Sequence, residues 1–191
     1  MTGIWTVILA AGSASRFGSP KALATWNNGQ TLLERAINSA PQVENIVVVT
    51  GAHHEAISAS LSETQYVLNN NWEAGMGSSI AYGIKHVFQN KGDMALIVPV
   101  DQPFITRSYL QEIAAQCGNE NRCILTLDHE IIGPPAAVPK HYFNQLFSLK
   151  SEGLKVALRD YGLCEGRNIL RDIDTPQDLE RFSQTSNRDG I

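Results

Sequence analysis

The sequence predicts an α/β protein of three layers (α/β/α), in which helices cover both faces of a mostly parallel sheet. Apolar runs rich in β-branched residues alternate along the chain with segments of helical periodicity. These apolar runs are nearly continuous, which indicates strands buried on both faces, as in parallel sheets. With 191 residues the chain is long enough for one well-buried domain and short for two.

Four segments are expected to be buried strands. They cover residues 4–9, 45–50, 94–100 and 122–127. The second reads Asn-Ile-Val-Val-Val-Thr and is stopped by Gly51. In sheets of this kind ligands bind beyond the carboxyl ends of the strands, so the loops that follow these strands are where a site is expected.

Two helices have recognisable start signals. Thr31 and Glu34 form a capping-box pattern for a helix that reaches about Ser39. Thr106 is expected to cap a helix that ends near Gly118. Helices in these positions would connect successive strands, as a parallel sheet requires.

Two further helices are predicted, and with them the extent of the domain. A helix over 77–89 presents one apolar face, made by Ile80, Ile84, Val87 and Phe88. Thr175 and Pro176 supply an N-cap and a first-turn proline for the last helix. We expect residues 1–182 to form a single domain and the polar residues 183–191 to be a flexible tail.

The overall composition argues against several classes of protein. A net charge of −4 disfavours nucleic-acid and membrane-surface binding, which call for basic patches. Cys117, Cys123 and Cys164 are scattered, so neither a disulfide framework nor a zinc site is indicated. The sequence begins without a signal-peptide pattern and has no apolar run of about 20 residues. A cytoplasmic protein that binds no nucleic acid and no membrane is therefore expected.

The loop after the first expected strand has the composition of an anion-binding site. It reads Leu-Ala-Ala-Gly-Ser-Ala-Ser-Arg-Phe-Gly-Ser-Pro-Lys over residues 9–21. Small residues let a backbone approach a ligand closely, and successive N–H groups form a concavity that suits anions. Arg16 and Lys21 add two cations suited to phosphate oxygens. The spacing matches neither a Walker A loop nor a Gly-x-Gly-x-x-Gly fingerprint. We interpret the loop as a clamp for a polyphosphate, with these expected nucleotide contacts: Leu9, Ala10, Ala11, Gly12, Ser13, Arg16 and Lys21.

Carboxylates are expected beside this clamp. Asp101 directly follows a buried strand, where it could hold Mg²⁺ or be an ordinary turn residue. Asp172 and Asp174 are two residues apart, so on a strand they would face the same side. Either could complete a metal site, with Asp174 favoured, or Asp174 could only cap the helix at Thr175.

A third segment, 69–80, combines glycines with serines at the start of a predicted helix. Gly75 and Gly77 allow a close-approach loop, and Ser78 and Ser79 offer hydroxyl and N–H groups to a ligand. The alternative is a plain helix cap. On the first reading Gly75 and Ser79 belong to the nucleotide-binding set.

These motifs together resemble a known family. The loop over 9–21 resembles the Leu-Ala-Ala-Gly-x-Ser-x-Arg-Phe/Met-Gly-x-x-Lys signature of the MobA-like NTP transferases, which handle the molybdenum cofactor. The segments at 69–80, 101–103 and 172–179 resemble three further motifs of that family, and they follow one another along the chain in the family's order. The resemblance implies a Rossmann-like fold of the nucleotide-diphospho-sugar transferase type. It also implies that Asp101 ligates the metal, that an acid at Asp172 or Asp174 completes its shell, and that Ser79 touches the base.

The resemblance implies a cytidylyltransferase, which would transfer CMP from CTP to molybdopterin with Mg²⁺ and release pyrophosphate. In the family Ala-Ala-Gly in the first motif accompanies cytidine, and the Ala11 methyl group would narrow the space beside the base. A molybdenum hydroxylase is the implied client of the product. Two alternatives remain: a different small phosphate acceptor, such as a sugar or alditol phosphate, or a non-catalytic protein that binds the cofactor during maturation. Catalysis is expected to rest on Arg16, Lys21 and Asp101.

The chain departs from the family pattern at Pro134, and its histidines show no metal-binding pattern. Pro134 stands where the family more often has a histidine, in a Gly-His-Pro segment before a helix, so no role is carried over for that histidine. The remaining histidines have no partner at metal-ligand spacing. His53, His54 and His129 are therefore expected to be surface or loop residues, and His86 to lie on the exposed side of its helix.

Overall fold

A single sheet organises the chain. The computed structural model describes residues 3–189, and the strands within them form one seven-stranded sheet in the order β3-β2-β1-β4-β6-β5-β7. The strands are β1 (Ile4–Ala10), β2 (Ile46–Thr50), β3 (Gln65–Leu68), β4 (Met94–Pro99), β5 (Ile124–Asp128), β6 (Ile131–Pro139) and β7 (Gly162–Glu165). Of these described strands, β6 alone runs against the others. The predicted mostly parallel sheet is confirmed.

Helices cover both faces of this sheet. They are α1 (Leu32–Ser39), α2 (His54–Ser58), α3 (Met76–Gln89), α4 (Arg107–Glu120), α5 (Phe143–Leu146), α6 (Leu154–Ala157) and α7 (Pro176–Asp189). Short 3-10 turns lie at η1 (Lys21–Leu23), η2 (Asn27–Gly29), η3 (Trp72–Ala74) and η4 (Lys140–Tyr142).

Alternate residues of each strand enter the two halves of the core. In β1, Val7 packs with the side chains of α3, α5 and α6, whereas Ile8 packs with those of α1. In β4, Ile97 joins the α3 side and Leu96 packs with α4. Because successive strand residues point to opposite faces, this alternation is what a sheet between two helical layers requires. The three-layer architecture is therefore confirmed.

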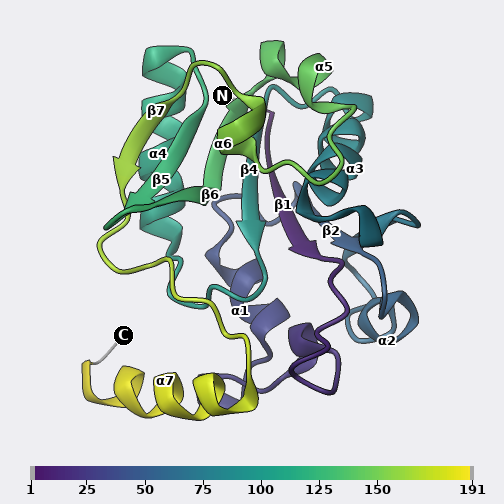
Figure 1. Cartoon of the computed structure of the whole chain (residues 1–191), viewed down its shortest axis with the longest axis vertical. Helices are drawn as coiled ribbons and strands as arrows, with labels where there is room; N and C mark the ends of the chain where they lie inside the picture. Colours follow the sequence, from purple (N-terminus) through teal and green to yellow (C-terminus); the bar gives the residue numbers. More distant parts are fainter. Residues whose placement is uncertain (1–2, 190–191) are drawn as a thin grey trace.

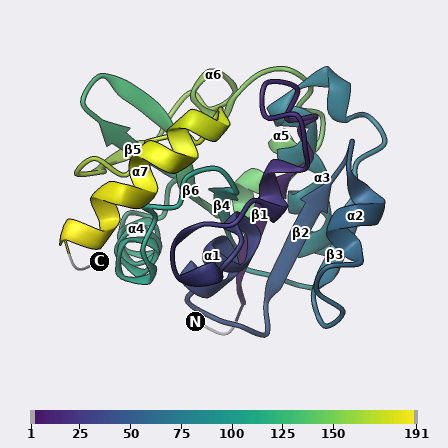
Figure 2. The same ribbon diagram turned by 90° about the horizontal axis from the view of Figure 1, so that it is seen from below.

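The loops expected to carry the site meet at one edge of the sheet. In Figure 1 the arrows of β1 and β4 point toward the lower end of the molecule, where the chain after β1 and the start of α7 lie. Figure 2 looks onto this edge and shows α7 crossing it beside the loop that follows β1. The carboxyl ends of parallel strands thus bring together segments that are far apart in the sequence.

Three strands were not expected from the sequence. β3 and β7 have four residues each and lie at the two edges of the sheet, so they are too short and too polar to stand out. β6 contains Pro134 and Pro135, which cannot donate to a ladder. The register with β5 shifts between Thr126↔Gly133 and Leu125↔Ala136, so both prolines lie at the irregularity. The segment that was compared with the family's Gly-His-Pro segment therefore lies in an antiparallel strand.

Two helices start at the capping residues predicted from the sequence, whereas the apolar face of α3 and the length of α7 differ from the prediction. Thr31 and Glu34 form the predicted capping box, and the Thr106 hydroxyl accepts from the N–H of Tyr109. In α3, Phe88 lies half-exposed against the Phe147 ring and outside the core. The helix α7 continues to Asp189, so its backbone covers most of the segment expected to be a tail, and the flexibility of that segment stays a prediction.

The helices of residues 3–189 are all too short or too polar to cross a membrane.

Candidate active site

The loop after β1 is folded as an open backbone turn. Its turn depends on Ala14, whose φ of 49° is left-handed, and on Gly18, whose φ is 77°. The carbonyl of Ala14 accepts from the N–H groups of Phe17 and Gly18. No protein acceptor among the described residues takes the backbone N–H groups of 12–16. A run of unpaired N–H groups in such a turn suits an anion.

Lys21 joins two loops of the site. Its Nζ atom lies 2.7 Å from Oδ2 of Asp101 and 3.4 Å from Oδ1 of Asp174. Only 14% of the Lys21 side chain is exposed, compared with 26% for Asp101 and 38% for Asp174. The ammonium group therefore occupies the space between two carboxylates that lie far apart in the sequence.

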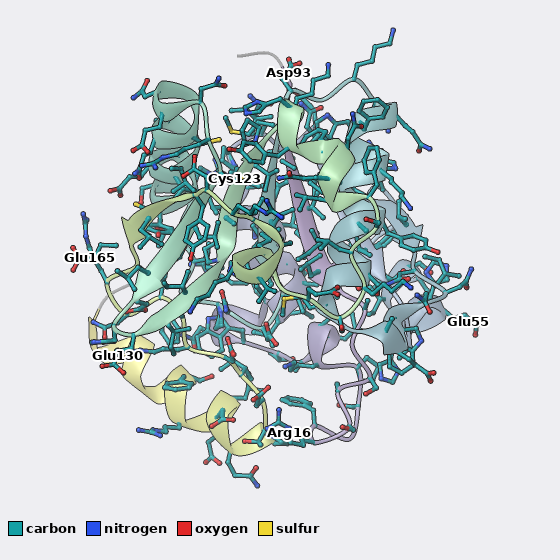
Figure 3. The ribbon with its side chains drawn as sticks, turned by 45° about the horizontal axis from the view of Figure 1, so that its top comes forward. Arg16, Glu55, Asp93, Cys123, Glu130 and Glu165 are labelled. Atoms are coloured by element: carbon teal, nitrogen blue, oxygen red, sulfur yellow. The ribbon has the colours of Figure 1, made fainter. Side chains whose placement is uncertain are left out.

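Arg16 is held at the rim of the same site. Its Nη2 atom lies 3.0 Å from Oδ2 of Asp174, and its side chain is 70% exposed. Figure 3 shows Arg16 at the lower end of the molecule beside the start of α7. An exposed ion pair of this kind contributes little to stability, so the guanidinium group can turn to a ligand at small cost.

The third carboxylate, Asp172, lies beside these two. Its Oδ1 atom accepts from Nε2 of Gln102 at 2.9 Å. Loss of hydration raises the pKa of Asp172, and the charges of Asp101 and Asp174 raise it further, whereas the Gln102 hydrogen bond and the Lys21 charge lower it. The charge of Asp172 therefore interacts with the charges of Asp101 and Asp174. The expected strand is absent, because 171–174 has no regular secondary structure and lies outside the sheet.

Backbone hydrogen bonds fix these loops to one another. The N–H of Val100 donates to the carbonyl of Leu9, and the N–H of Ile173 donates to the carbonyl of Asp101. The first bond joins the end of β4 to the end of β1. The second joins the loop after β4 to the segment before α7. The three segments that carry the charged residues are therefore held in fixed positions relative to one another.

α7 anchors the acidic segment from its other side. Asp178 accepts from the N–H and the hydroxyl of Thr175, and its own N–H donates back to that hydroxyl. Along the helix, Phe182 meets the Phe104 ring, which in turn meets Trp26, with ring centroids 5.7 Å apart in both pairs. These edge-to-face contacts hold the start of α7 against the loops that carry Lys21 and Asp101.

A cavity of about 280 Å³ opens between these loops. The predicted site residues that line it are Leu9, Ala10, Gly12, Ser13, Arg16, Lys21, Asp101 and Asp174. Ala11 does not line it, since the residue is only 5% exposed and its carbonyl accepts from the N–H of Ala52. Asp172, Gly75 and Ser79 also lie outside the lining. The fold therefore brings the phosphate loop and two of the three acidic residues together.

The serines of the third motif are engaged inside the protein. Asn69 is fully buried, and its Nδ2 atom donates to the hydroxyls of Ser78 and Ser79 at 2.8 and 3.1 Å. The N–H of Ser78 donates to the carbonyl of Lys150 and is not free for a ligand, contrary to the expectation for this helix start. These hydrogen bonds stabilise the connection between β3 and α3. A contact of Ser79 with the base stays a prediction.

The donor set fits a hard cation. Carboxylate oxygens are the ligands that Mg²⁺ and related ions prefer. Two of them, on Asp101 and Asp174, already lie within reach of one positive centre, the Lys21 ammonium. Within the described part of the chain no three acidic, His or Cys side chains are gathered as a ready set of ligands. Asp101 and Asp174 are therefore the residues best placed to hold a metal.

Three residues that shape the site were not expected from the sequence. His53, expected to be a surface or loop residue, lies in a loop and lines the cavity. Gln102 holds Asp172, and its own Oε1 atom is buried without a partner among the described residues. Asp128 is buried and accepts from the N–H groups of Asn168 and Leu170, which precede the acidic segment. The one signal in the sequence for Asp128 is its place directly after the strand expected over 122–127.

The model of the MobA-like NTP transferase domain matches residues 6–166. The chain belongs to the MobA-like NTP transferase family. The match includes the phosphate loop, the segment 69–80 and the loop that carries Asp101. Asp172 and Asp174 follow just beyond its end.

Individual relatives agree with this family. The molybdenum cofactor cytidylyltransferase of Escherichia coli is 28% identical, over 96% of this chain and 100% of that protein. A probable molybdenum cofactor guanylyltransferase of Bacillus cytotoxicus is 29% identical over 66% of this chain, but the match spans only 63% of that relative's length. Two solved structures share the fold. A Methanothermobacter nucleotidyl transferase has a TM-score of 0.79 at 21% identity, covering 99% of this chain and 100% of that one. A Mycobacterium tuberculosis protein in complex with manganese has a TM-score of 0.71 at 19% identity, covering 96% and 100%.

Proposed function

We propose that this protein is a nucleotidyltransferase that moves CMP from CTP to the terminal phosphate of molybdopterin and releases pyrophosphate. The observation that carries the proposal is the meeting of Lys21 with Asp101 and Asp174 beside an open phosphate loop. The cytidylyl assignment is supported by the match to the Escherichia coli cytidylyltransferase over its whole length.

The reaction needs positioning and neutralisation of charge more than proton transfer. An oxygen of the acceptor phosphate attacks the α-phosphorus of the nucleotide, and the bond from that phosphorus to the β-phosphate oxygen breaks. A phosphate monoester is already anionic near neutral pH, so no general base is required. This agrees with a cavity whose charged lining consists of Arg16, Lys21, Asp101 and Asp174, with His53 tied to the backbone.

In this account the loop amides of 12–16 and Arg16 bind the β- and γ-phosphates and stabilise the departing pyrophosphate. Arg16 is exposed, and among the described residues its ion-pair partner is Asp174, so it can turn toward a phosphate. Lys21 places a positive charge at the centre of the site. When the phosphates bind, its ammonium group divides its hydrogen bonds between the phosphate oxygens and the carboxylates. Each of these groups gains most when charge shifts to the leaving oxygen.

We further propose Mg²⁺ as the divalent cation, held by Asp101 and Asp174 with Asp172 nearby. When bound, Mg²⁺ would neutralise the phosphate oxygens and orient them. Three carboxylates outnumber the two cations of the site, so an added divalent cation would offset the excess negative charge. A protein of the same fold was crystallised in complex with manganese, which supports the use of a divalent cation.

A label-transfer experiment tests the proposal. The protein is incubated with CTP labelled at the α-phosphate, molybdopterin and Mg²⁺, and the products are separated. We expect the label to move into a cytidine dinucleotide of the acceptor. Label that stays in CTP would contradict the transfer, and label that moves only to a sugar phosphate or alditol phosphate added in place of molybdopterin would change the acceptor.

A further inference from the structure

His53 connects the loop after β2 to the phosphate loop. Its Nε2 atom lies 2.8 Å from the carbonyl oxygen of Ser13. The imidazole is half-buried, lines the 280 Å³ cavity, and also lines a neighbouring cavity over the ends of β2 and β3. A carbonyl oxygen only accepts, so Nε2 is the donor in this bond.

This bond fixes the direction of a peptide group in the phosphate loop. In a trans peptide the C=O and the following N–H point in opposite directions. When the Ser13 carbonyl is turned to His53, the N–H of Ala14 is turned away from it. The next carbonyl, on Ala14, is occupied by Phe17 and Gly18. Neither carbonyl is then free to face a bound anion, which it would repel.

The peptide needs such a restraint because the loop is strained there. Ala14 has a φ of 49°, a left-handed conformation that costs a residue with a Cβ roughly 1–2 kcal/mol. A rotation of the peptide between Ser13 and Ala14 would relieve that strain and would turn the Ser13 carbonyl round. No other hydrogen bond to the Ser13 carbonyl is found among the described residues.

We propose that His53 is a positioning residue of the phosphate loop. By donating to the Ser13 carbonyl it holds the loop in the form that presents N–H groups to the phosphates of the nucleotide. The identity of that anion as a nucleoside triphosphate rests on the proposed function, whereas the role of His53 in shaping an anion site does not.

Binding of inorganic tripolyphosphate tests this role without any transfer reaction. Calorimetric titrations compare the wild type with His53→Ala, His53→Gln and His53→Asn. The amide nitrogen of Gln reaches to about the position of Nε2, whereas that of Asn stops near Nδ1. We expect His53→Ala and His53→Asn to bind at least ~10-fold more weakly, and His53→Gln to stay within ~3-fold of the wild type. His141→Ala, at the exposed η4 turn far from the site, is the matched control.

Each outcome has a defined meaning. Equal binding by the wild type, His53→Ala and His53→Asn would overturn the proposal, as would a wild type that binds no tripolyphosphate. If His53→Ala fails to fold, the comparison of Gln with Asn decides. In the transfer assay the loss should appear mainly as a higher KM for the nucleotide. A wild type that binds tripolyphosphate but transfers no nucleotide would overturn the proposed function and leave the role of His53 intact.

Discussion

The Nζ atom of Lys21 lies 2.7 Å from Oδ2 of Asp101, although 80 residues separate the two in the sequence. Both side chains are largely shielded from solvent, so this charge-assisted hydrogen bond is stronger than a surface ion pair. It joins the phosphate loop to the loop after β4. The same ammonium group also reaches Asp174, so one cation holds together the three segments from which the site is built.

Loss of either cation should impair turnover. We expect Lys21→Ala and Arg16→Ala each to lower turnover by at least ~10²-fold, which is the scale of losing one preorganised transition-state donor. Steady-state rates at saturating nucleotide measure the effect. Lys140→Ala is the control, because Lys140 forms an exposed ion pair with Asp93 at the opposite end of β4. Near-normal turnover in both site variants would contradict the phosphate clamp.

Asp101→Asn should abolish metal-dependent activity and leave the protein folded. The amide keeps the shape of the side chain but loses the charge that a hard cation requires. Activity is measured across a Mg²⁺ titration together with thermal melting, and Asp93→Asn is the control. Removal of metal with a chelator should reproduce the loss in the wild type. Unfolding of Asp101→Asn would instead assign the residue a structural role.

Asp172 should make stability depend on pH. Its pKa is raised in the folded state, so folding favours its protonated form and its charge opposes folding as the pH rises through that raised pKa. Asp172→Asn should therefore be more stable than the wild type near neutral pH, and the difference should shrink in acid. Urea unfolding at about pH 7 and about pH 4 measures this. The exposed Glu130→Gln controls for the loss of one charge, and a difference independent of pH would contradict the account.

Four buried strands and the phosphate loop could be predicted from the sequence because both depend on local patterns. Apolar runs indicated β1, β2, β4 and β5, and small residues beside Arg16 indicated the loop. The short edge strands carry too few residues for such a pattern, and β6 is obscured by Pro134 and Pro135. His53 and Gln102 gained their roles only from contacts between distant loops. Local sequence patterns do not indicate contacts between residues that are far apart in the chain.

Gly51 should be intolerant of a side chain. A Cβ atom at this position would lie 2.5 Å from the carbonyl oxygen of Ala11 and 2.7 Å from the Cβ of Trp72. Gly51→Ala should therefore lower the free energy of unfolding by about 1–3 kcal/mol and displace the start of the phosphate loop. Chemical denaturation measures the change. Gly153→Ala is the matched control, since no atom lies within 4 Å of its added Cβ, and equal stability of the two variants would contradict the close approach.

The most direct test of nucleotidyl transfer is the release of pyrophosphate from each of the four nucleoside triphosphates, with and without molybdopterin. We expect release to require both molybdopterin and a divalent cation, and kcat/KM to be highest for CTP. A higher kcat/KM for GTP would contradict the cytidylyl assignment, and no release from any of the four would contradict nucleotidyl transfer itself.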